Sequence, residues 1–144
     1  MITGLNHVAL SVADFDRSVA FYRDLLDCEV TRILDCPPEK GLGDVVGMPG
    51  CAARIAHLQS GDMMFEIFEY HDPRGKPIPP DHKQADHGFT HVGFTSTDAK
   101  ADYERLKAHG VKFFSEPIEF RPDVWIFYFY GPDGEVCELR QAND

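Results

Sequence analysis

The sequence predicts an α+β protein built from two copies of one module, each with the order strand, helix and then three strands. Two segments of the 144-residue chain repeat, HVALSVAD at 7–14 and HVGFTSTD at 91–98. A second pair closes each copy, GDMMFE at 61–66 and GEVCE at 134–138. Internal repeats guide the whole assignment, because each copy is expected to fold into the same supersecondary unit.

Each copy continues from its opening segment into a helix. Apolar residues recur with helical spacing over 15–26 (FDRSVAFYRDLL) and over 99–110 (AKADYERLKAHG). Asp14 and Asp98 precede these segments, where an aspartate side chain accepts hydrogen bonds from the free backbone N–H groups of the first turn. Gly110 ends the second helix, as glycine commonly does.

The remaining segments of each copy are expected to be strands, because β-branched and aromatic residues alternate there between turn residues. The expected strands are 5–12, 28–34, 52–59 and 62–70 in the first copy, and 89–96, 111–115, 124–130 and 135–140 in the second. We therefore interpret 1–144 as a single domain with a first module at 1–70, a linker at 71–88 and a second module at 89–144. Residues 36–50, rich in glycine and proline, hold the extra chain of the first module.

Composition narrows the classes of partner. The formal net charge is −10, which argues against nucleic acid and anionic membranes and leaves a small molecule as the expected substrate. The opening MITGLNHVAL lacks the pattern of a signal peptide, and no apolar run approaches the roughly 20 residues of a membrane span. The four cysteines form no CxxC pair. We expect a cytoplasmic protein with reduced thiols.

Four side chains suited to metal binding occupy equivalent places in the two copies. His7 and His91 open the copies, and Glu66 and Glu138 close them. If the halves pair about a pseudo-twofold axis, all four meet at one point. Two neutral imidazoles and two carboxylates balance a 2+ charge and suit Ni²⁺, Co²⁺, Zn²⁺, Fe²⁺ or Mn²⁺. The sequence therefore predicts one divalent metal ion held by these four residues.

Other residues of the same types are assigned different roles. Side chains alternate between the two faces of a strand, so Glu69 and Glu135 point away from the predicted ligands. The histidines without an equivalent in the other copy are assigned to packing or to the surface. These are His57, His71, His82, His87 and His109. The aromatic segment VWIFYFY at 124–130 is expected to contribute mainly to the core.

At these residues the chain resembles the vicinal oxygen chelate superfamily, which includes glyoxalase I, methylmalonyl-CoA epimerase, extradiol dioxygenases, and fosfomycin and bleomycin resistance proteins. The likeness covers nearly the whole chain and is carried by LNHVALSVADFDRSVAFYRDLL, MMFEIFEY, GFTHVGFTSTD and YGPDGEVCELRQ. It implies paired βαβββ modules forming a cupped, incompletely closed mixed sheet around one metal, the glyoxalase-like fold. The ligand set at 7, 66, 91 and 138 is similar to that of bacterial glyoxalase I, where a ligand Glu moves the substrate proton.

The function that we expect is a divalent-metal-dependent lyase or isomerase, of the glyoxalase or epimerase type. It would transfer a proton next to a metal-chelated carbonyl or enediolate, with Glu138 as the first choice of base and Glu66 as the second. The alternatives are an Fe(II) extradiol-type dioxygenase, which needs only two His and one carboxylate, and a non-catalytic or thiol-transferring resistance protein of the same superfamily. A homodimer is expected, because open sheet edges favour pairing.

Overall fold

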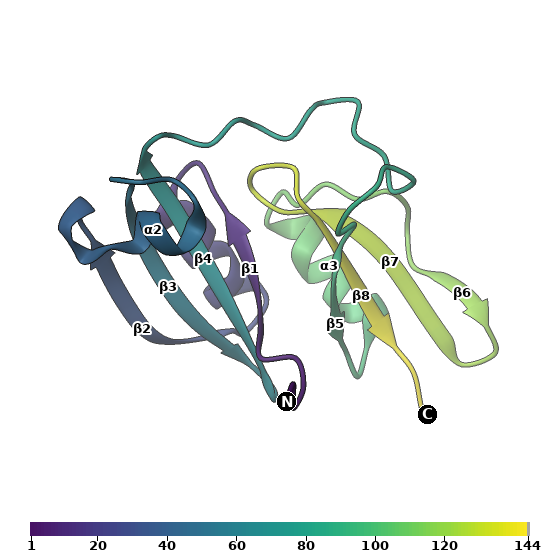
Figure 1. Cartoon of the computed structure of the whole chain (residues 1–144). Helices are drawn as coiled ribbons and strands as arrows, with labels where there is room; N and C mark the ends of the chain where they lie inside the picture. Colours follow the sequence, from purple (N-terminus) through teal and green to yellow (C-terminus); the bar gives the residue numbers. More distant parts are fainter. Residues whose placement is uncertain (144) are drawn as a thin grey trace. The chain divides into compact units, whose positions relative to one another are not determined.

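The repeat predicted from the sequence is present in the structure. The computed structural model describes residues 1–143, and the chain forms two compact units, Met1–Pro77 and Ile78–Asp144. Each unit contains one open four-stranded sheet, with the strand order β1-β4-β3-β2 in the first and β5-β8-β7-β6 in the second. The two orders are equivalent, strand for strand (Figure 1). The α+β class with two βαβββ modules and unclosed mixed sheets is confirmed.

The first unit holds most of the helical turns. Its elements are β1 (His7–Ser11), α1 (Phe15–Ala20), the π-helical turn η1 (Phe21–Leu25), β2 (Glu29–Cys36), the 3-10 turn η2 (Pro38–Lys40), α2 (Leu42–Val46), β3 (Ala52–Ser60) and β4 (Met63–Asp72). Strand β1 runs parallel to β4, whereas β3 is antiparallel to both β4 and β2. The glycine-rich segment 36–50 thus carries two short helices, η2 and α2.

The second unit repeats this plan with fewer elements. They are β5 (Val92–Thr95), α3 (Ala99–Ala108), β6 (Ile118–Arg121), β7 (Val124–Tyr130) and β8 (Val136–Gln141). Strand β5 is parallel to β8, and β7 is antiparallel to β8 and to β6. Helix α3 contacts β7 and β8 and lies against one face of their sheet (Figure 1). No helix in residues 1–143 is both long and apolar enough to cross a membrane.

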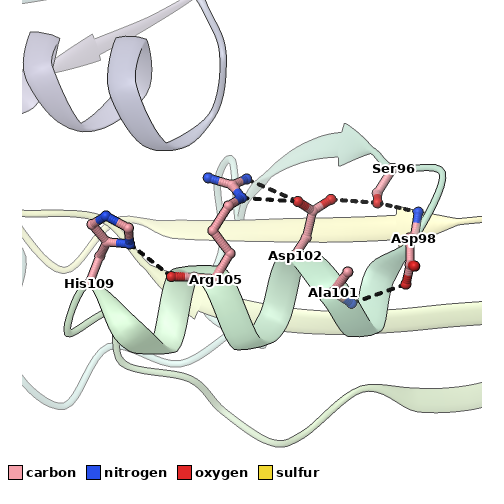
Figure 2. A network of polar contacts seen from close by, with 6 residues as sticks. All are labelled: Ser96, Asp98, Ala101, Asp102, Arg105 and His109. Carbon is pink, nitrogen blue, oxygen red and sulfur yellow. Dashed lines mark hydrogen bonds and ion pairs between the residues drawn. The ribbon is translucent and has the colours of Figure 1, made fainter.

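The predicted helix starts are confirmed by their capping contacts. Asp14 accepts a hydrogen bond from the backbone N–H of Arg17 at 2.9 Å. Asp98 does the same for Ala101 at 3.0 Å, at the start of the polar network along α3 in Figure 2. Farther along that network, Asp102 accepts from Ser96 Oγ at 2.6 Å. The bonds to Asp14 and Asp98 satisfy backbone N–H donors that a helix cannot pair internally.

The last strand of each unit also anchors the N-terminus of that unit's first helix. Three residues after Glu66, the side chain of Glu69 accepts from the backbone N–H of Phe15 at 2.5 Å. Three residues after Glu138, Gln141 accepts from the backbone N–H of Ala99 at 2.8 Å. Both anchors lie on the helix-facing side of their strand. They leave the opposite side of β4 and β8 for the predicted ligands.

The apolar cores lie between each helix and its sheet. In the first unit, Tyr22 is fully buried and its ring centroid lies 4.8 Å from that of Phe65. In the second, Tyr103 of α3 packs with Phe113 and Phe127, at ring-centroid distances of 4.5 and 5.7 Å. Aromatic packing of this kind stabilises each module on the side away from the predicted ligands.

One predicted strand is wrong. Residues 111–115 form no strand, and their pairing with β7 is limited to an isolated bridge between Phe113 and Phe129. The strand that pairs with β7 is instead β6, which aligns Ile118 with Ile126. Pro117 lies between the bridge and β6 and has no backbone N–H to donate, so a continuous ladder cannot form there.

Candidate metal centre

The first unit brings two predicted ligands together on its open face. His7 lies on the edge strand β1, and Glu66 lies on the neighbouring strand β4, whose register places Ala9 opposite Glu66. The Nε2 atom of His7 is 3.2 Å from Glu66 Oε2. On the other side of the ring, His7 Nδ1 lies 2.8 Å from Asn6 Oδ1. An amide oxygen only accepts hydrogen bonds, so we assign the proton of this imidazole to Nδ1.

The second unit repeats this arrangement. His91 directly precedes β5, and its Nε2 atom is 3.0 Å from Oε2 of Glu138 on β8. His91 Nδ1 lies 3.1 Å from Gln84 Oε1 and 2.9 Å from Thr90 Oγ1. The Gln84 amide nitrogen donates to the Thr90 carbonyl at 3.0 Å, which turns its oxygen towards the imidazole. Gln84 therefore fixes the same tautomer of His91 that Asn6 fixes in His7.

This geometry calls for a positive species between each imidazole and its carboxylate. A neutral imidazole that is protonated at Nδ1 presents a lone pair at Nε2, and that lone pair faces a carboxylate oxygen in both units. A proton or a metal ion relieves the repulsion. Two ligands at right angles on one ion, each about 2.1 Å from it, lie about 3.0 Å apart. The observed separations of 3.0 and 3.2 Å match this value, so the residues of each pair fit a divalent ion.

Each carboxylate has a further neighbour on the adjacent antiparallel strand. His57 of β3 lies opposite Glu66, and Tyr128 of β7 lies opposite Glu138. His57 Nε2 is 3.1 Å from Glu66 Oε1. Burial raises the pKa of Tyr128 to about 12, with further contributions from the hydrogen bond to Glu138 and its negative charge. Tyr128 thus keeps its proton near neutral pH and can donate it in a hydrogen bond.

The structure brings the four predicted ligands together as two pairs, one in each unit. Within residues 1–143, no group of three or more His, Cys, Asp or Glu side chains is arranged to hold a metal ion by itself. The carboxylate of Glu66 contacts both His7 and His57, and each imidazole lies against a different oxygen. That all four ligands share one ion therefore stays a prediction.

The side chains expected to point away do so. Glu69 caps α1, and its carboxylate also lies 3.0 Å from His71 Nε2. Glu135 is buried and accepts from the backbone N–H of Asp133 at 2.8 Å, within the turn that follows β7. The expectation that the aromatic segment contributes to the core is confirmed for Phe127, which is 1% exposed.

Sequence reasoning missed three residues around the ligands, namely Asn6, His57 and Gln84. A usable signal existed for His57. Ser60 pairs with Met63 across a two-residue turn, and three further pairs along the hairpin place His57 opposite Glu66. For Gln84 the chain offers no periodic signal, because the residue lies in the linker rather than in a strand.

Comparison with known proteins agrees with this architecture. The model of the Glyoxalase/Bleomycin resistance protein/Dioxygenase superfamily matches residues 4–139. A 2-epi-5-epi-valiolone epimerase from Actinomyces sp is 31% identical, over 94% of this chain and 77% of the epimerase. A glyoxalase family protein from Bacillus cereus has a similar structure, with a TM-score of 0.89 at 18% identity, covering 98% of this chain and 95% of that protein.

A structure with a bound metal ion lies among the relatives. It is the fosfomycin resistance protein FosX from Listeria monocytogenes in complex with Mn(II) and sulfate, with a TM-score of 0.63 at 19% identity, covering 99% of this chain and 95% of FosX. At this identity the likeness establishes the fold alone. Because the family model spans nearly the whole sequence, the chain belongs to the Glyoxalase/Bleomycin resistance protein/Dioxygenase superfamily.

Proposed function

We propose that the protein is a divalent-metal-dependent epimerase or isomerase that transfers a proton at a carbon next to a carbonyl group. The observation that carries this proposal is the matched setting of the two imidazoles. Each is held at Nδ1 by a side-chain oxygen and presents Nε2 to a carboxylate, at 3.2 Å for His7 and 3.0 Å for His91. Metal-ligating histidines have this kind of partner at the second nitrogen.

The likeness to an epimerase supports this reaction class, and the likeness to the metallothiol transferase FosB and the glutathione transferase FosA keeps thiol transfer as the alternative. A 2-His-1-carboxylate oxygenase site needs a single carboxylate, whereas this chain presents two, each beside its own imidazole. In the proposed site His7, Glu66, His91 and Glu138 hold the ion. When bound, the metal ion acts as a Lewis acid on the substrate carbonyl and makes the neighbouring C–H bond more acidic.

Glu138 is the proposed base. It accepts the proton as the C–H bond breaks, and the electron pair of that bond shifts towards the carbonyl. An epimerase then returns a proton to the other side of the same carbon, and an isomerase returns it to the neighbouring carbon. Glu66 is the second choice, because both of its oxygens already contact imidazoles. The side chain of Glu138 is 15% exposed, so little water competes for it.

The histidines have a different task in this scheme. An imidazole bound through its lone pair cannot also accept a proton, so His7 and His91 serve to hold the ion. A carboxylate can loosen from the ion and take up a proton. The two residue types should therefore respond differently to substitution.

The test is exchange of the substrate proton with solvent deuterium, measured together with metal content. The substrates are 2-epi-5-epi-valiolone, α-hydroxy ketones, hemithioacetals and 2-substituted acyl thioesters, each with protein reloaded with Ni²⁺, Co²⁺, Zn²⁺ or Mn²⁺. Glu138→Gln should keep measurable metal through its amide oxygen while exchange falls by about 10²–10⁴-fold, as expected for a lost general base. His91→Ala should lose metal and exchange together.

Two outcomes would contradict the proposal. A metal-to-chain ratio near zero for every ion would remove the site. If Glu138→Gln and Glu66→Gln both exchange at the wild-type rate, neither carboxylate is the base, and oxygen uptake with catechols by the Fe²⁺-loaded protein becomes the next measurement.

We also propose a cytoplasmic homodimer. Strands β1, β2, β5 and β6 each end an open sheet, and such edges invite pairing with another chain. Light scattering at micromolar protein should give about twice the chain mass. A value near one chain, 16.2 kDa, would contradict the dimer.

A further inference from the structure

We propose that His57 is a positioning residue that holds Glu66 as a one-oxygen ligand of the metal ion. This inference rests on the proposed function, because it concerns the same ion. It assigns a role to a residue that neither the repeat nor the predicted ligand set includes.

The contacts divide the Glu66 carboxylate between two imidazoles. His57 Nε2 lies 3.1 Å from Oε1, and His7 Nε2 lies 3.2 Å from Oε2. His7 is itself a proposed ligand, so Oε2 faces the position that the ion would occupy. Oε1 is turned to His57, which donates its Nε2 proton to it. With Oε1 engaged in this way, the carboxylate offers the ion a single oxygen.

The backbone fixes His57 in place. The antiparallel ladder between β3 and β4 sets His57 directly opposite Glu66, and side chains at such positions share one face of the sheet. On the other side of β3, Thr31 Oγ1 donates to the His57 carbonyl at 3.2 Å, next to the register shift in β2. Strand β3 therefore presents the imidazole from a central position of the sheet, with neighbouring strands on both sides.

Burial makes this contact more effective than a surface pair. The side chains of His57 and Glu66 are 21% and 12% exposed. A hydrogen bond to a charged partner is shorter and stronger than one between neutral groups. Hydrogen bonds that orient a ligating carboxylate typically change metal affinity by about 10–100-fold.

The second unit has a different residue at the equivalent position. Tyr128 lies opposite Glu138, and its hydroxyl is shared between the hydrogen bond to Glu138 and a 3.5 Å contact with His91 Nε2. Glu66, by contrast, contacts an imidazole at each of its two oxygens. The two carboxylates, equivalent by the repeat, are thus set apart by their cross-strand neighbours. This difference favours Glu66 as the fixed ligand and leaves Glu138 as the carboxylate that moves the proton.

The experiment compares the wild type with His57→Ala, His57→Gln and Gln59→Ala. Gln59 is the matched control, because it lies two residues along β3 on the same face and pairs with Met64 rather than with a ligand. His57→Gln is chosen because its side-chain amide can place an N–H donor where Nε2 of His57 lies. The readouts are Ni²⁺ affinity by competition with a coloured chelator, the visible absorption of the Co²⁺ form, and the melting temperature of the metal-free proteins.

We expect His57→Ala to weaken Ni²⁺ binding by about 10–100-fold and to change the Co²⁺ spectrum. His57→Gln should restore most of the affinity, and Gln59→Ala should match the wild type in both readouts. The metal-free variants should melt close to one another.

The inference is overturned if His57→Ala binds Ni²⁺ as tightly as the wild type, or if Gln59→Ala loses as much affinity, which would indicate general damage to the sheet. It is also overturned if His57→Gln binds as weakly as His57→Ala. These results leave the proposed function standing, because the wild type still binds metal. If the wild type itself binds no metal, the proposed function fails, and the role of His57 fails with it.

Discussion

The linker residue Gln84 offers a direct test of how the second imidazole is held. Its amide oxygen lies 3.1 Å from His91 Nδ1, and its amide nitrogen donates to the Thr90 carbonyl at 3.0 Å. We expect Gln84→Ala to weaken metal binding without removing it, because His91 would lose the acceptor that fixes its tautomer. Thr90 Oγ1, at 2.9 Å from the same nitrogen, remains as a partial substitute.

The size of the effect follows from two independent estimates. A net hydrogen bond of about 0.5–1.5 kcal/mol corresponds to roughly 2–13-fold in affinity. Loss of a residue that orients a metal ligand typically costs about 10–100-fold. The ranges overlap near tenfold, and the remaining Thr90 contact favours this lower end of the second range. We therefore expect about a tenfold weaker Kd, or about 1.4 kcal/mol.

Titration calorimetry of the metal-free protein with Ni²⁺ measures this change. Gln84→Glu is the matched variant, because it keeps an acceptor oxygen for Nδ1 and loses the donor to the Thr90 carbonyl. It should bind metal more tightly than Gln84→Ala. If Gln84→Ala binds with the wild-type Kd, the linker does not orient His91. The Nδ1 contact of His91 then no longer supports the metal site, and only that of His7 does.

Three further predictions concern metal removal, pH and thiol access. Metal at 100 times its Kd should stabilise the fold by about 2.7 kcal/mol. Removing the metal with a chelator should therefore lower the melting temperature by roughly 5–11 °C. A melting temperature that changes with no ion would contradict the metal site. Because the pKa of Tyr128 is raised to about 12, above the usual value of about 10, the folded metal-free protein keeps a proton that the unfolded chain releases. Its stability should therefore fall between about pH 10 and pH 12. Tyr128→Phe should reduce this loss in pH-dependent urea melts, and the raised pKa of Tyr70 leaves part of it. Cys36 is the least buried of the four cysteines, and burial raises the pKa of the Cys28 thiol, so a thiol reagent should label one cysteine rapidly in the native protein and all four in denaturant.

Much of the fold could be predicted because the signals are local. Asp14 and Asp98 could be predicted as helix caps because each directly precedes a segment with helical spacing. The structure shows both side chains in the expected capping bonds. The strand expected at 111–115 failed for a non-local reason. Its aromatic residues resemble a strand, but Phe113 serves the core by packing against Tyr103 of α3, and the ladder with β7 resumes only after Pro117.

The site divides in the same way. The residue types and their equivalent places in the repeat predicted one ion held by all four ligands. The structure shows His7 in contact with Glu66 and His91 in contact with Glu138, and the shared ion stays a prediction. The partners of these pairs depend on register between strands and on the path of a linker. Register is set by the turn and by the buried face together, so His57 becomes visible only when β3 and β4 are aligned.

The two faces of β4 carry residues with different roles, a predicted metal ligand and a helix anchor, only three positions apart. Glu66 faces the predicted ion, whereas Glu69 accepts the first N–H of α1 on the opposite face. Substitutions on one face can therefore accumulate without disturbing the other, which lets a lineage change its chemistry while keeping its scaffold. A change in length is different, because inserting or deleting one residue between them exchanges the faces and removes both contacts at once. Homologous chains should accordingly vary in length within segments such as 36–50 and the linker at 71–88, and remain constant in length between the ligand glutamate and the helix anchor.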